Sequence, residues 1–500
     1  MAIDPAKNNA FRKKIYLEIA LATFLGTLAT NIVNISLPAI SSYFRIDTGL
    51  VTWVSIIYLL VLCSTIVVFG KMADIRGAKK IFLAGFAVFT IASLLCGLSL
   101  NIYMLIVSRA LQAVGAAMSI AVGPALIATL LPPESRGKGM GYLSTSNAVG
   151  IALGPAIGGY LTTYLSWRAI FFINIPICIF AIILGMKVIP ELPGTEAGEK
   201  LDLTGAILLI ASLAGAAFAM NMAGKMGFES LFVIGSVLIF LIFGFAFFFR
   251  EKRTKEPLID LGMLRNGCFS FANMASMMSM LIFAGAMFVM PFYLQVLRGY
   301  SANIAGLILM APPVVMMLLA PYAGSYADKH GTIKICTVAS ILAAVSFVLL
   351  HTIDEATPLS LVVVYTVLMG MSITLFVSPN MSFIMGNCPI QYRGIGSSLT
   401  MGIRYLGSMI GVASFGAVYA AHLPMAVSSS THISGHLSPE ASTALAGAFH
   451  SSFFLGIVFS VLMIVFTVLS RNGPCVRCKL QKTEADQLSA KLSDGQEEAA

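Results

Sequence analysis

Apolar stretches alternate with short polar segments along almost the whole chain. A helix of about 20 apolar residues is long enough to cross the hydrocarbon core of a bilayer, so each stretch predicts a membrane-spanning helix. The pattern predicts fourteen spans, at residues 15–38, 49–70, 81–100, 102–131, 139–164, 169–189, 203–222, 228–249, 268–292, 302–326, 333–351, 358–385, 394–421 and 447–470. We therefore expect an all-α polytopic membrane protein.

The composition excludes a soluble protein of this size. Of the 500 residues, 58% are hydrophobic and only 11% are charged, whereas soluble domains carry about 25% charged residues. The first span follows three basic residues, but its apolar run is too long for a cleavable signal peptide. We expect this span to remain in the membrane.

The basic residues predict the orientation of the spans, because cytoplasmic loops carry the excess of Lys and Arg. With the amino terminus in the cytoplasm, 25 of the 31 basic residues are cytoplasmic, four face outward, and Arg109 and Arg404 lie inside spans. We therefore predict a multi-pass protein of the cell membrane with both termini cytoplasmic. Topology also accounts for the net charge of +9, so no nucleic-acid partner is expected.

Signals for metal, cofactor or nucleotide chemistry are weak. Cys475 and Cys478 form a single CxxC, whereas zinc normally needs four ligands, so no metal or cofactor is predicted. The segment GKGMG at 137–141 lacks the preceding strand and the Lys-Ser/Thr ending of a phosphate-binding loop. We expect neither an ATP-driven mechanism nor an enzyme.

Three pairs of segments repeat at nearly one offset. GKMADIRG at 70–77 and GSYADKHG at 324–331 both fit G-x-x-A-D-x-x-G. GAAMSIAVGP at 115–124 is similar to GMSITLFVSP at 370–379, and an Arg-Gly-x-Gly segment from Arg136 matches one from Arg393. These matches predict two parallel six-helix halves, with the seventh and eighth spans inserted between them.

The predicted organisation follows from these repeats. It comprises an N-terminal tail (1–14), an N-terminal six-helix half (15–190), two inserted helices (203–249), a cytoplasmic linker (250–267), a C-terminal six-helix half (268–470) and a C-terminal tail (471–500).

Several motifs resemble those of the major facilitator superfamily. The 70–77 loop followed by Lys79 and Lys80 resembles its loop signature, and SRALQAVGAA at 108–117 resembles its fourth-span signature. GIALGPAIGGYL at 150–161 is similar to the fifth-span signature of antiporters. The stretches at 31–40 and 167–176 are similar to those of drug:proton antiporters with fourteen spans. The resemblance implies export of a small molecule in exchange for protons.

The sequence departs from that family at three positions. Ile75 and Ala78 stand where the loop signature usually has basic residues, and Ala29 stands where the first span usually has an aspartate. The usual proton-carrying acid is therefore missing from the first span.

Ionisable residues inside spans are functional candidates because a charge in the bilayer is costly. Arg109, with Gln112 one turn away, either serves transport or snorkels outward. Arg404 lies deep in the thirteenth span opposite its repeat mate Asn147, and either lines a central cavity or bonds to neighbouring helices. Glu18 is the one carboxylate predicted to enter a span, and it lies about one turn from the cytoplasmic edge. We expect it chiefly to form a solvated ion pair with the nearby lysines, with proton carriage as the alternative.

Three further sets of residues complete the candidate site. The first span carries a polar stripe that includes Asn31 and Asn34. The stripe either lines a water-filled path or packs against a neighbouring span. The repeated loops predict a conformational latch formed by Gly70, Asp74, Gly77, Lys79, Asp328 and Gly331. Small residues let membrane helices approach closely, which predicts a packing seam at Gly150, Gly154, Pro155, Gly158 and Gly159.

Together these features predict a secondary transporter that exports drugs or amphiphilic small molecules by alternating access. The expected partners are a small-molecule substrate, protons and the lipid bilayer, and a monomer is expected. The alternatives are an exporter of an anionic metabolite, suggested by the two buried arginines, and a transport-derived membrane sensor or assembly protein.

Overall fold

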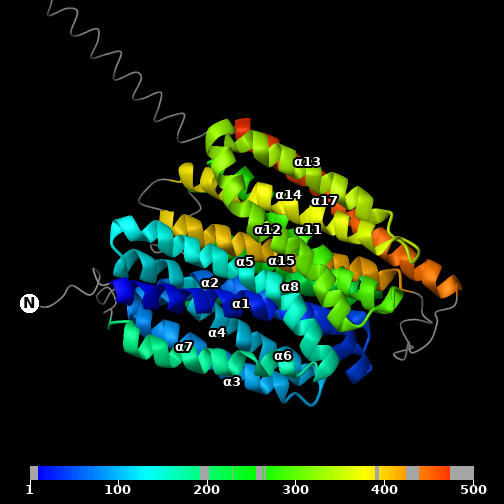
Figure 1. Cartoon of the computed structure of the whole chain (residues 1–500), viewed down its shortest axis with the longest axis horizontal. Helices are drawn as coiled ribbons and strands as arrows, with labels where there is room; N and C mark the ends of the chain where they lie inside the picture. Colours follow the sequence, from blue (N-terminus) through cyan, green and yellow to red (C-terminus); the bar gives the residue numbers. More distant parts are fainter. Residues whose placement is uncertain are drawn as a thin grey trace, which may run out of the picture.

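The computed structural model describes residues 9–191, 202–227, 229–254, 263, 266–388, 393–423 and 439–472. Every regular element in these residues is helical, and the long helices run roughly side by side (Figure 1). The N-terminal half comprises α1 (Asn9–Phe44), α2 (Thr48–Arg76), α3 (Ala78–Gly97), α4 (Ile102–Leu130), α5 (Pro133–Tyr164), α6 (Ala169–Phe172) and α7 (Asn174–Val188).

The remaining helices form the insert and the C-terminal half. The insert is α8 (Leu203–Met226) and α9 (Leu231–Arg253). The C-terminal half comprises α11 (Gly267–Phe292), the π-helical η2 (Tyr293–Leu297), α12 (Ala302–His330), α13 (Thr332–His351), α14 (Leu359–Gly386), α15 (Arg393–Ala421) and α17 (Pro439–Asn472).

Each of the fourteen predicted spans coincides with a helix, the sixth being α6 and α7 together. Thirteen helical segments in the described residues are long and apolar enough to cross a membrane. The exception is α5, whose Ser, Thr, Asn and Gly residues lower its apolarity. Because α5 packs between α1 and α12, protein rather than lipid covers two of its sides.

Several helices extend past the predicted span boundaries. The first helix begins at Asn9, inside the predicted tail, α9 continues to Arg253, inside the predicted linker, and α17 begins at Pro439. An apolar run marks only the part of a helix that lies in lipid, whereas backbone hydrogen bonding continues into the polar flanks.

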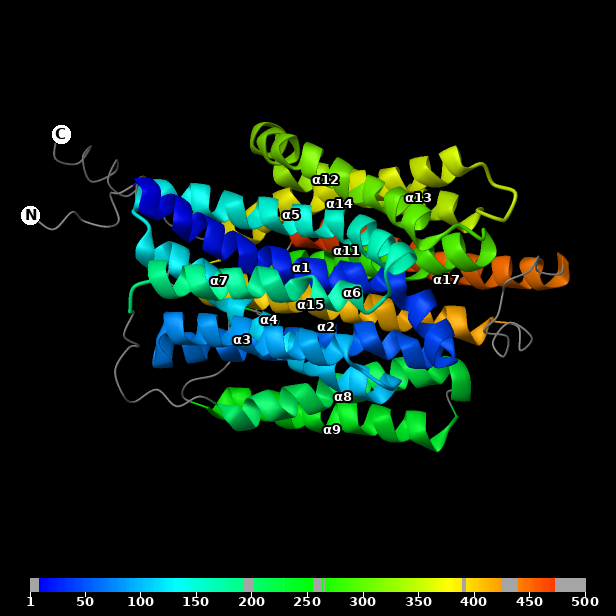
Figure 2. The ribbon, with the colours of Figure 1, turned by 60° about the horizontal axis from the view of Figure 1, so that its bottom comes forward.

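The two halves pack in the same way. The first and fifth helices of each half lie together, as α1 with α5 and α11 with α15. Across the molecule α5 packs on α12, and α15 packs on α2. In both pairs the fifth helix of one half meets the second helix of the other half. Figure 2 shows α8 and α9 at one edge, and α8 contacts both α2 and α15. The insert therefore covers one of the two seams between the halves.

The repeated loops adopt the same turn in both halves. Gly77 joins α2 to α3 with φ of 97°, and Gly331 joins α12 to α13 with φ of 93°. Both values lie in the region that favours glycine because a Cβ is strained there. This requirement explains why the last glycine of G-x-x-A-D-x-x-G recurs.

Candidate functional site

The halves touch at the end of the bundle away from the first residues of α1. The amide of Asn303 on α12 donates to Thr163 Oγ1 on α5 at 3.0 Å, and Gln295 Nε2 donates to the Ile35 carbonyl of α1 at 2.8 Å. Both views show α5 and α12 diverging toward the opposite end, where α1 begins (Figures 1 and 2). These hydrogen bonds close the boundary between the halves at that end.

Glycines allow this close contact. A Cβ on Gly159 would meet the Ala302 carbonyl of α12, and one on Gly306 would meet the Pro155 carbonyl of α5. Two helix backbones therefore touch across the boundary between the halves, and only glycine has room at these two positions.

A small pocket lies behind this seal, at the boundary between the halves. Its polar groups are Asn31 and Asn34 of α1, where Asn34 Oδ1 accepts a hydrogen bond from Ser55 Oγ at 2.8 Å. The remaining lining residues are Ile35, Pro155, Met287, Pro291 and Leu309. The arrangement combines two amides with an apolar wall from both halves, around a space of about 10 Å³ that is the size of one water molecule.

Asn147 and Arg404 occupy equivalent places in the two halves. Asn147 on α5 accepts a hydrogen bond from Thr27 of α1 at 2.9 Å. Arg404 on α15 donates to the Met280 sulfur of α11 at 3.7 Å, while its Nε is buried with no partner among the described residues. Each side chain thus joins the fifth helix of its half to the first, and Arg404 keeps an unused donor.

Arg109 lies inside the N-terminal half and not at the pocket. It has no exposed surface, which contradicts outward snorkelling. It donates to the Val54 carbonyl at 3.1 Å and the Ala29 carbonyl at 3.3 Å, and to Gln112 Oε1 at 2.6 Å. Its guanidinium stacks 4.1 Å from the centre of the Tyr58 ring. These contacts connect α1, α2 and α4.

Glu18 differs from the expected solvated ion pair. Its side chain is fully buried, and neither carboxyl oxygen has a hydrogen-bond partner. Lys13 and Lys14 are exposed, and neither donates to the Glu18 carboxyl. The expectation is wrong because nearness to the chain end does not decide which face of the helix points inward.

One residue of the candidate latch, Lys79, has partners within the N-terminal half. Lys79 pairs with Glu191 at 3.2 Å and donates to the Met186 carbonyl at 3.5 Å. A Cβ on Gly70 would meet nothing within 4 Å. The side chains of Asp74 and Asp328 lie outside what the structure describes, so the latch stays a prediction.

The predicted glycine face of α5 packs on α1. A Cβ built on Gly154 would lie 2.8 Å from Asn31 Cβ, and one on Gly158 would lie 2.6 Å from the Ile32 carbonyl. Gly150 faces the Phe24 carbonyl at 3.0 Å in the same way. Any side chain at these positions would push α5 away from the helix that carries the pocket amides.

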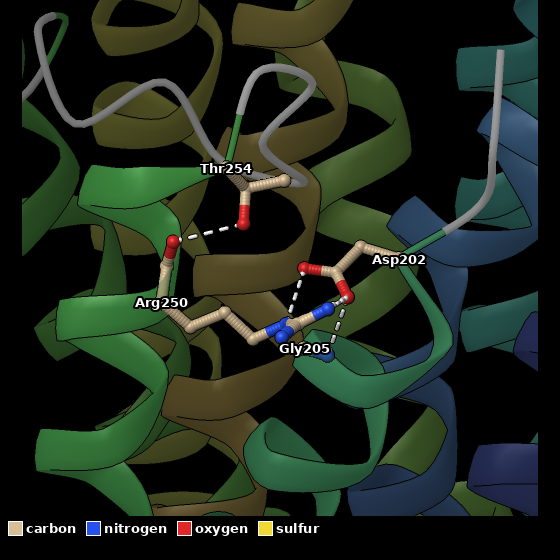
Figure 3. A network of polar contacts seen from close by, with 4 residues as sticks. All are labelled: Asp202, Gly205, Arg250 and Thr254. Atoms are coloured by element: carbon tan, nitrogen blue, oxygen red, sulfur yellow. Dashed lines mark hydrogen bonds and ion pairs between the residues drawn. The ribbon is translucent and has the colours of Figure 1, made fainter.

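The sequence reading missed the ion pair that ties the insert together. Arg250 of α9 donates to both carboxyl oxygens of Asp202, at 2.8 and 3.0 Å, and Asp202 also caps α8 by accepting from the Gly205 amide (Figure 3). Burial opposes ionisation of Asp202, but bonds from Arg250 and Gly205 outweigh it and hold the pKa of the carboxyl below its ordinary 3.8. Asp202 before an apolar run signals a helix cap, but nothing in the sequence signals its partner.

The described residues contain no group of His, Cys, Asp and Glu side chains that could hold a metal ion. The CxxC at Cys475 and Cys478 lies outside those residues.

Comparison with known proteins gives one consistent result. Residues 19–204 and 203–412 match the family profile described as Major Facilitator Superfamily. The riboflavin transporter RibZ of Clostridioides difficile is 32% identical over 90% of this chain and 97% of its own length. Multidrug resistance protein 3 of Bacillus subtilis is 27% identical over 80% of this chain and 79% of its own.

A solved structure shares the fold. The inward-facing, unoccupied structure of a bacterial homolog of the human lysosomal transporter Spinster superposes with a TM-score of 0.65 at 14% identity. It covers 93% of this chain and 98% of its own.

Proposed function

We propose that this chain, which belongs to the Major Facilitator Superfamily, is a secondary exporter of amphiphilic small molecules that exchanges them for protons across the cell membrane. Both termini are cytoplasmic in this proposal, so the closed end of the α5–α12 seam faces outward. The observation that carries the proposal is the pocket between the halves, directly behind that closed end. Rocking of the halves about such a site gives alternating access.

The pocket residues suggest how a substrate is held. Asn31 and Asn34 offer amide donors and acceptors, while Met287 supplies a flexible apolar surface that adapts to varied ligands. Asn147 and Arg404 extend the polar lining on the fifth helix of each half. Arg109 and Gln112 serve transport by positioning α1, since the donors of Arg109 that have partners bond to Ala29, Val54 and Gln112.

A second candidate is an exporter of an anionic metabolite or of a flat molecule rich in hydrogen-bond acceptors. Arg404 favours it, because the buried Nε has no protein partner and no ion pair to Arg404 occurs among the described residues. A buried cation with a free donor is a natural partner for a carboxylate, phosphate or ring carbonyl. The likeness to RibZ suggests riboflavin as one molecule to test.

The test compares fluorescent molecules of similar size and different charge. Ethidium, riboflavin and fluorescein are offered to inverted vesicles with an imposed pH gradient, beside vesicles without the protein. The lead proposal expects gradient-driven uptake of ethidium, and the second expects uptake of fluorescein or riboflavin that Arg404→Gln abolishes and Arg404→Lys partly restores. Uptake that is indifferent to the pH gradient would contradict proton exchange.

A further inference from the structure

The carboxyl of Glu18 is sealed between three helices of the N-terminal half. It lies on α1, and a Cβ built on Gly185 of α7 would lie 2.7 Å from Glu18 Oε1 and 2.7 Å from Leu83 Cδ2 of α3. Neither Glu18 oxygen has a hydrogen-bond partner, and none of the side chain is exposed. Glycine at 185 is what leaves room for the carboxyl.

No cation pairs with this carboxyl in the described conformation. Lys14 lies one turn before Glu18 on α1 but is exposed, as are Lys80 on α3 and Lys187 on α7. Lys79 on α3 is occupied by Glu191 and the Met186 carbonyl. The one charged residue of α4, Arg109, bonds to other helices.

A buried carboxylate without a partner is strongly disfavoured, whereas the neutral acid is tolerated in an apolar site. The pocket of Glu18 therefore accommodates the protonated form. Movement of α1 away from α3 and α7 would open the carboxyl to water. Hydration favours the charged form, so the site can take up and release one proton.

The site is separate from the pocket between the halves. Glu18 and Asn31 are thirteen residues apart on one helix, which corresponds to about 20 Å. Proton and substrate thus bind to the same rigid element without competing for the same group. This layout differs from one in which an acid at position 29 binds both.

We propose that Glu18 is the proton-binding group of the exchange. Its carboxyl is protonated in the buried arrangement of this structure and loses the proton when α1 shifts and opens it to cytoplasmic water. Gly185 is a positioning residue that sets the depth of the carboxyl. The inference rests on the proposed function and adds which group carries the proton and from which helices it is released.

Purified full-length protein in proteoliposomes tests this, with ethidium as the probe and fluorescein if the wild type carries that dye instead. Two activities are measured: uptake driven by a pH gradient, and exchange of internal for external dye without a gradient. Glu18→Gln is expected to lose driven uptake while keeping exchange and dye binding. Glu355→Gln, an exposed carboxylate at the opposite end of the bundle, is the matched control and is expected to keep both activities.

The outcomes separate the two proposals. If a pH gradient drives no dye uptake by the wild-type protein, proton exchange itself is refuted. Driven uptake in the wild type that persists in Glu18→Gln would overturn the assignment of Glu18 alone. If Glu18→Gln fails to fold, infrared difference spectra that follow a pH change are recorded for the wild type, Glu18→Asp and Gly185→Ala. These spectra then test whether Glu18 binds the proton. A protonated-carboxyl band that shifts in both variants supports the site, and an unchanged band overturns it.

Discussion

Arg109 shows how a single buried charge can organise a membrane domain without an acidic partner. Its Nε and Nη1 bond to carbonyls of α1 and α2 and to Gln112 on its own helix, while its buried Nη2 has no partner among the described residues. Gln112 in turn donates to Ser93 Oγ on α3 at 2.8 Å. Ala29 supplies only its carbonyl to this network. Four helices are thus held by one network built largely on main-chain atoms.

We predict that Arg109→Ala abolishes transport, measured as pH-gradient-driven uptake into inverted vesicles at matched expression. The change removes the bonds to the Ala29 and Val54 carbonyls and leaves Gln112 Oε1 without a donor, which costs about 1–3 kcal/mol for such a buried group. Arg109→Lys should recover little, because lysine lacks the planar fork that reaches all three partners. Arg253→Ala, at an exposed arginine of α9, is the control and should transport normally. Full activity in Arg109→Ala would refute this role.

The helix α5 forms a tight seam because small residues replace side-chain packing with backbone contact. Gly158 faces α1, whereas Gly159 faces α12 of the other half. The helix α5 therefore contacts both the core of its own half and the boundary with the other half. Such contacts matter in lipid, where burial of apolar side chains supplies no force between helices.

At this element, Gly158→Leu should lose most transport while the protein still inserts in the membrane. A Cβ there would lie 2.6 Å from the Ile32 carbonyl, so α5 must move away from α1. Gly141→Leu on the same helix is the matched control, because a Cβ there meets nothing within 4 Å. Uptake and membrane content are measured for both. Equal uptake by the two variants would show that the seam is not needed.

The insert is held at one end by the Asp202–Arg250 pair. Because the pKa of Asp202 is lowered in the folded protein, the pair stabilises the fold above the ordinary pKa of 3.8, and this stability is lost as the pH falls through the lowered value. Asp202→Asn keeps a helix cap but loses the charge. We expect it to melt at a lower temperature than the wild type at neutral pH.

The pH dependence of that melting difference is the decisive measurement. Thermal unfolding of purified wild type and Asp202→Asn is followed from neutral pH downward. The gap between the two melting temperatures should narrow once the pH falls below 3.8. A gap that stays constant or widens on acidification would contradict the ion pair as its source.

At the scale of the whole molecule, two seams join the halves and they are not equivalent. The α2–α15 seam is covered by α8, whereas the α5–α12 seam is closed by backbone contact at one end and diverges at the other (Figure 2). Alternating access requires that closed end to open. The contact between Thr163 and Asn303 lies on this route.

A disulfide across this end should stop transport reversibly. With Thr163→Cys and Asn303→Cys, oxidation is expected to abolish uptake and a reductant to restore it, because the halves can no longer separate there. Ser36→Cys with Thr162→Cys replaces two hydroxyls that lie 2.7 Å apart on α1 and α5, within one half. Its oxidation should leave uptake intact. Transport by the oxidised 163–303 pair would refute opening at this seam.

The amino-acid sequence alone determined which stretches are helical and that the two halves are repeats of one another. The length of an apolar run and repeated motifs such as those ending at Gly77 and Gly331 are local properties of the sequence. They can therefore be recognised without knowledge of the tertiary structure. Only the tertiary structure decided that Glu18 is sealed, that Arg109 lies away from the pocket of Asn31 and Asn34, and that Asp202 meets Arg250. Lipid and protein interior are similarly apolar, so hydropathy cannot tell which face of a helix meets lipid and which meets another helix. That choice is made only when the helices pack.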